Sequence, residues 1–245
     1  MFDILEKYRA IFFAKAVEIV PSPDVISTLL NMFSDKGLLP TTFQEIGPQS
    51  RVPLVRLRLN SPNNEWGINF ASDHIDIEKN LTLAAARNMG DVADFTKDAK
   101  AFFSRILEQF KKKGHRLAII TTGMLQEMTD KQLSNIFTKL FRPLPFYKRA
   151  MPFEWNARCV SKSTKLIGEA SESINVITSI NRIQGQLSEP DRVTQFDRIQ
   201  VAFDINTAAE NDDNRFTAES FKDFFDSALQ VRSEILDQIQ GIVNG

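Results

Sequence analysis

The sequence predicts an α+β protein made of two similar β-α-β-β-β-α lobes, each with an antiparallel sheet that helices cover on one face. Three observations lead to this fold. Several short stretches alternate apolar and polar residues, other segments carry apolar residues at helical spacing, and the order of these elements occurs twice along the chain. We therefore expect a first lobe over residues 1–113 and a second over 114–245, related by a pseudo-two-fold axis within one integrated domain.

The first lobe opens with an apolar run at residues 10–20 that predicts a strand. Residues 22–24 read Ser-Pro-Asp and supply an N-cap, a first-turn proline and a first-turn acid, so a helix begins there and ends near residues 36–37. A helix capped by Thr96 closes the lobe, and its lysine-rich end stops at Gly114. Between the two helices, three alternating stretches predict an antiparallel meander at residues 55–59, 66–70 and 75–77.

The second lobe repeats this order. Residues 116–122 predict a strand, and Thr129 with Gln132 forms a capping box before a second amphipathic helix. A proline-rich connection at 143–152 follows, and Thr217 caps a long final helix. Three further strands are predicted from alternation, at residues 155–159, 174–180 and 198–205.

This order of elements resembles the saddle of the TATA-box-binding protein, in which two such repeats form one curved sheet. In that family the concave face is apolar and carries Phe wedges that kink DNA. The strand faces that we expect to meet solvent here carry charged and amide side chains of mixed sign, which argues against DNA binding on that face. These residues are Arg56, Arg58, Asn69, Asp76, Glu78, Asn156, Arg158, Gln200 and Asp204.

A second resemblance is to a family of bacterial conserved hypothetical proteins of about this length. It rests on the hairpin sequence PLVRLRLNSPNNEWGINF, the strand HRLAII and the closing helix with its Phe-Phe pair, and it spans most of the chain. Members of that family continue the strand into Arg-Tyr-Ile-Asn, whereas residues 119–122 read Ile-Ile-Thr-Thr here. The resemblance implies no active site.

The composition excludes several classes of protein. With one cysteine and two histidines, the chain has no internal disulfide and no Cys-based zinc site, and most metalloenzymes built on His or Cys are excluded. We expect Cys159 to fill core space beside Trp155 and Ala157. Charged residues among positions 3–18 interrupt any signal-peptide core or membrane span. The sequence therefore predicts a cytoplasmic protein that has no cofactor and does not enter a membrane.

One candidate site lies on a single predicted strand. His74, Asp76 and Glu78 alternate there, so their side chains share a face at a spacing of about 7 Å. One histidine and two carboxylates suit a divalent ion used for hydrolysis. The same alternation is typical of the wet face of an ordinary antiparallel strand, and we favour this surface-strand interpretation because the sequence shows no further ligand cluster to complete a metal site.

A second candidate site lies in the basic middle of the chain. Residues 111–165 contain 12 Lys and Arg against 3 Asp and Glu, and residues 189–245 contain 5 against 12, so the simplest explanation is that the two regions neutralise each other within the fold. A nucleic-acid surface is the alternative, with Phe146 and Tyr147 stacking on bases. A solvated loop whose aromatic residues return to the core would show the same pattern. The candidate anion-binding residues are Lys139, Arg142, Lys148, Arg149, Lys162 and Lys165.

No catalytic motif is visible in the sequence. Glycine-rich phosphate loops, serine nucleophile elbows and paired histidine ligands do not occur. We therefore expect a non-catalytic binding or interaction protein, a component of a multi-protein bacterial system that has a protein partner. The alternatives are a nucleic-acid-binding protein that uses residues 139–165, and a metal-dependent hydrolase at His74, Asp76 and Glu78.

Overall fold

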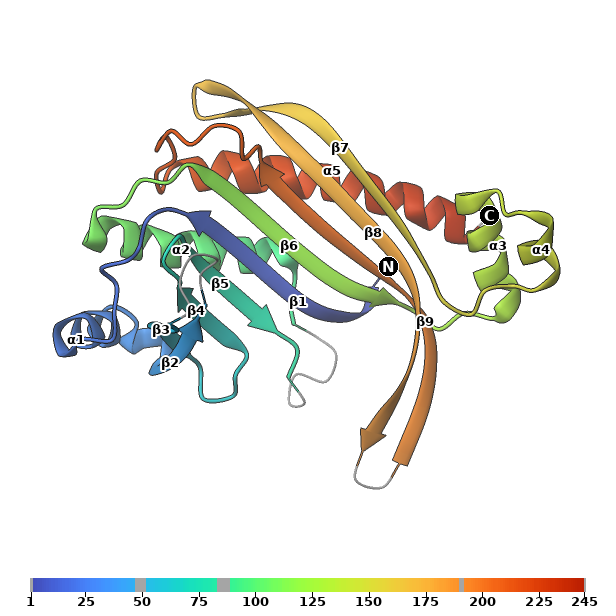
Figure 1. The fold of residues 1–245 in the computed structure, drawn as a ribbon, viewed down its shortest axis with the longest axis horizontal. Helices are drawn as coiled ribbons and strands as arrows, with labels where there is room; N and C mark the ends of the chain where they lie inside the picture. Colours follow the sequence, from blue (N-terminus) through green and yellow to red (C-terminus); the bar gives the residue numbers. More distant parts are fainter. Residues whose placement is uncertain (1, 47–51, 83–88, 190–191, 245) are drawn as a thin grey trace.

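One continuous antiparallel sheet of nine strands runs through the molecule, in the order β2-β3-β4-β5-β1-β6-β9-β8-β7 (Figure 1). The computed structural model describes residues 2–46, 52–82, 89–189 and 192–244. The strands are β1 (Phe2–Phe13), β2 (Leu39–Glu45), β3 (Leu54–Asn60), β4 (Trp66–Phe70), β5 (His74–Asn80), β6 (Arg116–Leu125), β7 (Trp155–Ile167), β8 (Ala170–Glu189) and β9 (Arg192–Thr207). The fold is α+β as predicted, but the two expected sheets are one, because β1 pairs with both β5 and β6.

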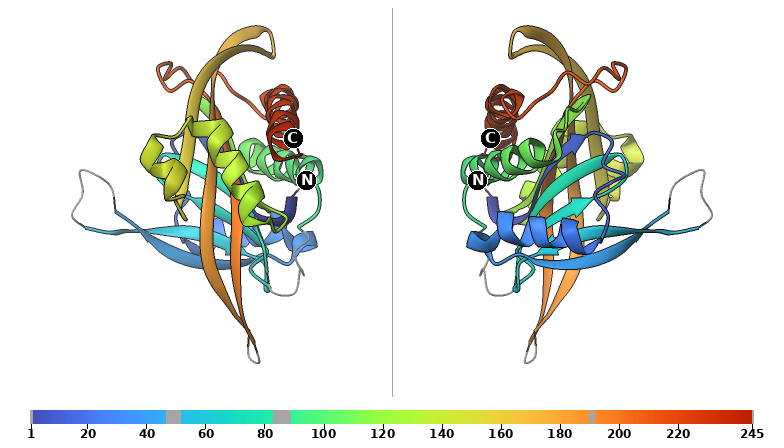
Figure 2. Two further views of the ribbon diagram at one scale, coloured as in Figure 1. Left: turned by 90° about the vertical axis from the view of Figure 1, so that its right-hand side faces the viewer. Right: turned by 90° about the vertical axis from the view of Figure 1, so that its left-hand side faces the viewer.

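Helices cover one face of this sheet. They are α1 (Pro23–Met32), α2 (Val92–Phe110), α3 (Asp130–Phe141), α4 (Pro145–Arg149) and α5 (Ser220–Asn244), with a 3₁₀ turn at Ser34–Lys36. Figure 2 shows α2 and α5 side by side across the sheet, with α3 and α4 at the end of the second half. Among the described residues, no helix combines the length and apolar character needed to cross a membrane.

The apolar core joins the two halves of the chain. Phe103 of α2 stacks on Phe221 of α5 with ring centroids 4.5 Å apart, and Phe12 of β1 lies 5.5 Å from Phe221. All three rings belong to one buried cluster that contains residues from both halves. A smaller cluster, which includes Phe137 and Trp155, lies between the second half of the sheet, α3 and the end of α5.

Two helix starts confirm the predicted signals. The Ser22 side chain accepts a hydrogen bond from the backbone amide of Val25 at the start of α1. At the start of α3, Thr129 Oγ1 accepts from the Gln132 amide while Gln132 Oε1 accepts from the Thr129 amide, which completes the capping box. These caps are visible in sequence because they depend on residues within one turn.

The two long helices begin elsewhere than predicted. Asp91 caps α2, and Thr96 lies inside the helix, where its hydroxyl donates to the carbonyl of Ala93. Lys111 ends α2 in the left-handed conformation, three residues before Gly114, where we expected the helix to stop. Gly114 is required for a different reason, because a Cβ there would lie 2.6 Å from the ring of Phe12. The final helix, α5, begins at Ser220 instead of at Thr217.

Several strands differ in length from the prediction. The first strand covers Phe2–Phe13, so the apolar residues from Val17 to Val20 follow it as a loop. We did not predict β2, whose sequence LPTTFQE lacks an apolar alternation. The second half has longer strands than expected, and β8 and β9 continue as a two-stranded ribbon beyond their neighbours (Figure 1).

Candidate functional site

Exposed aromatic side chains gather around α4, which lies between α3 and β7. Pro145 occupies the first turn of α4, which is only five residues long, so much of this connection lies at the surface. Among the described residues, every large aromatic side chain classed as exposed lies here, with Phe146 at 60% and Phe153 at 68%. We call this region the α4 surface, defined by Phe141, Arg142, Leu144, Phe146, Tyr147, Lys148, Arg149 and Phe153. The aromatic residues therefore do not return to the core.

A groove of about 500 Å³ runs across the α4 surface. Its lining includes Phe141, Leu144 and Tyr147, together with Trp155. Trp155 is 8% exposed, and its ring meets that of Phe141 edge to face with centroids 5.5 Å apart. Its indole Nε1 is buried and has no hydrogen-bond partner within the part of the chain that the structure describes. A buried donor without an acceptor costs about 1–3 kcal/mol, so an acceptor brought by a ligand would recover that cost.

Among the described residues that line this groove, one is a cation, Arg142, and further cations lie nearby on α4. Arg142 follows α3 in the left-handed conformation, and Lys148 and Arg149 lie in the last turn of α4. Glu154 is the acidic residue that lines the groove. Lys139 has a structural role, because its Nζ donates to the carbonyl of Ile242 near the end of α5. The α4 surface therefore combines exposed aromatic side chains with three cations, Arg142, Lys148 and Arg149.

A buried arginine anchors the segment that leads into β7. Arg182 is 5% exposed and donates to Asp197 Oδ1 at 3.0 Å and Oδ2 at 2.6 Å, and to the Pro152 carbonyl at 3.0 Å. These hydrogen bonds from Arg182 lower the pKa of Asp197, although partial burial opposes them. The chain before Trp155 is thus held in place, which gives the groove a defined wall.

The structure divides the predicted anion-binding set into two groups. Arg142, Lys148 and Arg149 belong to the α4 surface. Lys162 and Lys165 lie far along β7, since at about 3.3 Å per residue Lys162 is roughly 23 Å from Trp155. Lys162 also pairs with Glu210 at 2.7 Å. The six cations therefore do not form one continuous surface, because an extended strand separates them.

The predicted strand of His74, Asp76 and Glu78 is not an ordinary surface strand. Asp76 is 1% exposed and Glu78 8%, because Lys7 and Arg9 of the neighbouring β1 reach across them on the sheet face opposite α2. Glu78 Oε1 lies 2.8 Å from Lys7 Nζ and 3.3 Å from Arg9 Nε. Within the described part of the chain, no group of three or more His, Cys, Asp or Glu side chains is arranged to hold a metal ion.

Asp76 is the centre of a hydrogen-bonded cluster. Arg9 donates to both its carboxylate oxygens at 3.1 Å, and Asn69 donates to Oδ1 at 2.9 Å. His74 Nε2 lies 3.3 Å from Oδ2, and His74 Nδ1 lies 2.6 Å from Asp73. Burial alone would raise the pKa of Asp76, but the hydrogen bonds from His74 and Arg9 outweigh it and lower the pKa.

The same contacts predict a pH-dependent stability. Burial lowers the pKa of His74, but its hydrogen bonds to Asp76 and Asp73 outweigh that effect and raise the pKa above 6.5. A raised pKa means that protonated His74 stabilises the fold fully below pH 6.5 and that this contribution is lost as the pH rises through the folded-state pKa. We expect the stability difference between the wild type and His74→Gln to shrink between pH 5.5 and 8.5 in urea titrations. A difference that stays constant would contradict this assignment.

A second cluster with the same plan lies in the second half. Asn206 is 1% exposed, and its Oδ1 accepts from Arg116 at 2.9 Å and from Asn175 at 3.1 Å. Its Nδ2 donates to Asp204 at 2.8 Å. Asn206 thus accepts hydrogen bonds from an arginine and an asparagine, as the Asp76 carboxylate does. Where Asp76 contacts His74, Asn206 contacts Asp204.

Two other sequence interpretations change with the structure. Cys159 is exposed on β7 and does not fill the core beside Trp155, because β7 is the last strand of the sheet. Arg56, which we expected to meet solvent, is 3% exposed and donates to the backbone carbonyls of Ala16 and Ala71. Both errors arise because the alternation of apolar and polar residues does not show which elements pack beside a strand.

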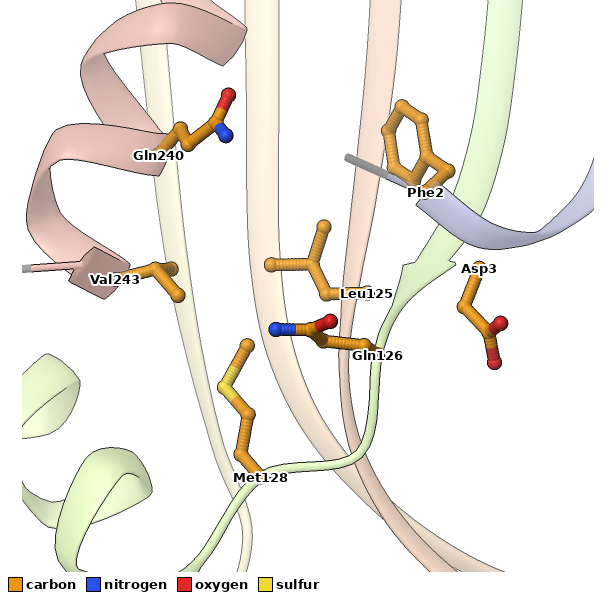
Figure 3. A pocket seen from close by; sticks show the side chains of 7 residues that line it. All are labelled: Phe2, Asp3, Leu125, Gln126, Met128, Gln240 and Val243. Carbon is orange, nitrogen blue, oxygen red and sulfur yellow. The ribbon is translucent and has the colours of Figure 1, made fainter.

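A second cavity, of about 280 Å³, lies between the end of β6 and the end of α5. Figure 3 shows that its lining side chains are mostly apolar or amide, among them Leu125, Met128 and Gln240. Its one charged residue, Asp3, accepts a hydrogen bond from Arg198 at 2.6 Å. This cavity therefore lacks the combination of exposed aromatic and cationic side chains found at the α4 surface.

No protein-family model, curated protein or solved structure matches this chain. The two resemblances inferred from the sequence therefore stay hypotheses. Sequence reasoning missed Leu144 at the α4 surface, and it gave no sign that Trp155 Nε1 would lack a partner among the described residues. Two prolines close to Phe146 and Tyr147 were the available signal, because a proline-broken connection tends to keep its side chains at the surface.

Proposed function

We propose that this chain is a non-catalytic binding protein that holds a segment of a partner protein on the α4 surface. The observation that carries the proposal is a groove lined by the exposed side chains of Phe141 and Tyr147 and by Trp155, whose buried Nε1 has no hydrogen-bond partner among the described residues. Aromatic residues and arginine are enriched at the centres of protein interfaces, and isolated monomers rarely expose several of them together. The proposal keeps the interaction role that the sequence led us to expect.

The chemistry of the groove indicates the kind of segment it accepts. An apolar side chain would fill the space between Phe141 and Tyr147, and acidic residues beside it would meet Arg142, Lys148 and Arg149. Trp155 Nε1 is buried, so a backbone carbonyl of the segment would supply its missing acceptor only if the indole turned toward the groove. The preferred partner segment is therefore apolar and acidic.

We also propose that the two halves are copies of one unit. Ile11, two residues after Arg9, pairs with Asp76, and Asp76 pairs with Asn69. In the second half, the corresponding residues pair in the same way across neighbouring strands. Ala118, two residues after Arg116, pairs with Asn206, and Asn206 pairs with Asn175. This agreement supports duplication, because two unrelated halves would have no reason to carry matching clusters at the same register.

If the two halves are copies of one unit, the segment in which they differ is a candidate for the binding role. Between its short helix and its meander, the first half has β2, and the second half has α4 at that point. A segment that is not part of the repeated unit does not have to pack as the repeated elements do. We infer that α4 carries the binding role for this reason.

Replacing Phe146 and Tyr147 together by serine tests the proposed function. Both side chains are exposed, so the free energy of unfolding should change by less than about 0.5 kcal/mol per site. Partner binding should fall by at least about tenfold, since two aromatic contacts at an interface centre are lost. The measurement is quantitative mass spectrometry of proteins that co-purify with the wild type and with the variant.

Ile46→Ser is the matched control, because Ile46 is exposed and apolar but lies beyond β2. It should retain the partner. An unchanged partner in the Phe146/Tyr147 variant contradicts the proposal. If the material lost is nucleic acid, and oligonucleotide affinity falls steeply with salt and with Lys148→Glu/Arg149→Glu, the nucleic-acid alternative replaces it.

A further inference from the structure

The outer edge of β7 is long and uncovered. β7 is the last strand of the sheet, contains 13 residues and pairs only with β8 among the described strands. Residues 158–162 are all exposed, on both faces of the strand. Edge strands offer unpaired backbone amides and carbonyls to any segment that can pair with them, and natural proteins commonly cover or interrupt such edges.

The first half shows what occupies the matching position. Counting outward from the β1–β6 junction, β3 and β7 hold the same place in the sheet order. β3 is covered by the antiparallel strand β2, in the register Thr41 to Arg58, whereas no described strand lies beyond β7. The outer edge of β2 is in turn interrupted by Pro40, which lacks an amide hydrogen, but β7 contains no proline.

We propose that the free edge of β7 takes an acidic, extended segment of a partner protein as a tenth strand of the sheet. The inference rests on the proposed function in one respect, that the chain binds a protein segment. β7 begins at Trp155, which lines the groove. A partner segment bound at the α4 surface could therefore continue along the free edge of β7. Strand addition provides affinity through backbone hydrogen bonds and specificity through alternate side chains.

Charge determines which occupant fits. β7 carries Arg158, Lys162 and Lys165 and no acidic residue. Lys162 pairs with Glu210, which follows β9 on the inner side of β7, at 2.7 Å. Arg158 and Lys165 are therefore the cations of β7 for which no ion pair is found among the described residues. A second copy of the chain would bring two cationic strands together, and like charges across a strand pair are destabilising. An acidic segment from a different protein avoids this repulsion.

Synthetic peptides test the edge directly. The probe is a nine-residue peptide in which glutamate alternates with valine, with a fluorescent label for anisotropy measurements on the full chain. Two further versions carry N-methyl groups on the odd or on the even backbone amides, and a fourth replaces glutamate by lysine. Because an added strand uses alternate amides toward the sheet, one N-methylated version should lose at least about tenfold in affinity and the other should keep it.

The location is tested with the single cysteine. A nitroxide on exposed Cys159, near the middle of β7, should broaden the proton signals of the bound peptide. Arg158→Glu/Lys162→Glu should weaken the glutamate peptide by at least about tenfold and strengthen the lysine peptide. Lys97→Glu/Lys100→Glu on α2 is the control with the same change of charge and should bind as the wild type does.

Three outcomes overturn the inference: equal binding of both N-methylated peptides, no broadening from Cys159, or self-association of the chain through β7. The proposed function fails separately. If the peptides do not bind but Phe146→Ser/Tyr147→Ser still loses its partner, only the edge inference is wrong. If the peptides bind at β7 but that variant keeps its partner, the proposed binding role of the α4 surface is wrong, while strand addition at β7 is supported.

Discussion

Replacing Arg56 by leucine is expected to lower the free energy of unfolding by about 3–5 kcal/mol. The Arg56 side chain is buried and donates four hydrogen bonds to backbone carbonyls, at distances between 2.6 and 3.1 Å. Two of these carbonyls belong to the loop after β1, one to Phe70 at the end of β4 and one to Ala71, the next residue. Leucine would leave all four without this donor and would leave the nearby Glu45 without its partner at 3.5 Å.

Urea unfolding measures this effect, and Arg58→Leu is the matched control. Arg58 lies two residues away on the same strand face, but its side chain is 34% exposed and donates mainly to Asn60. Its replacement should cost less than about 1 kcal/mol. Arg56→Lys should fall between the two leucine variants, because the three donors of an ammonium group lie at one point and do not span the four carbonyls that the planar guanidinium reaches. Equal costs for Arg56→Leu and Arg58→Leu would show that the buried hydrogen bonds contribute little.

Phe103→Ala is expected to cost about 3–5 kcal/mol and to destabilise both halves of the chain together. Phe103 lies where the halves meet, stacked on Phe221 and 6.1 Å from Phe12. Alanine would leave a cavity in the core cluster that both halves share. Phe103→Leu, which keeps most of the apolar volume, should cost less.

The two tryptophans make the shared loss measurable. Trp66 lies in β4 of the first half and Trp155 in β7 of the second, so Trp66→Phe and Trp155→Phe each leave one reporter. In both backgrounds Phe103→Ala should shift the urea transition to the same lower concentration. A shift seen only by Trp66 would mean that the halves unfold as separate units, as two independent domains would.

Local sequence signals predict much of the secondary structure. The meander at β3, β4 and β5 follows from alternation, and the caps at Ser22 and Thr129 follow from residues one turn apart. β2 was missed because Pro40, two threonines and a glutamine hide its pattern, and its pairing with β3 is what makes it a strand. The sequence of a single short segment does not show which distant strand it will pair with.

The candidate site was predicted only in part. The cations and aromatic residues near α4 are visible in the sequence, but their exposure depends on how the segment around Pro152 is held by Arg182. The same composition would fit a loop folded back onto the core. The burial of Asp76 was missed because it depends on Arg9, which reaches it from a strand distant in the sequence.

The central claim is that a partner protein binds at the α4 surface, and amide hydrogen exchange of the full chain with its purified partner tests it most directly. Bound partner should slow exchange in residues 142–153 and, if the edge of β7 is used, in residues 156–165, because backbone amides there become covered or hydrogen bonded. Exchange around β2 and β3 should not change. Protection confined to β2 and β3, or to the sheet face that carries Asp76 and Asn206, would contradict the account.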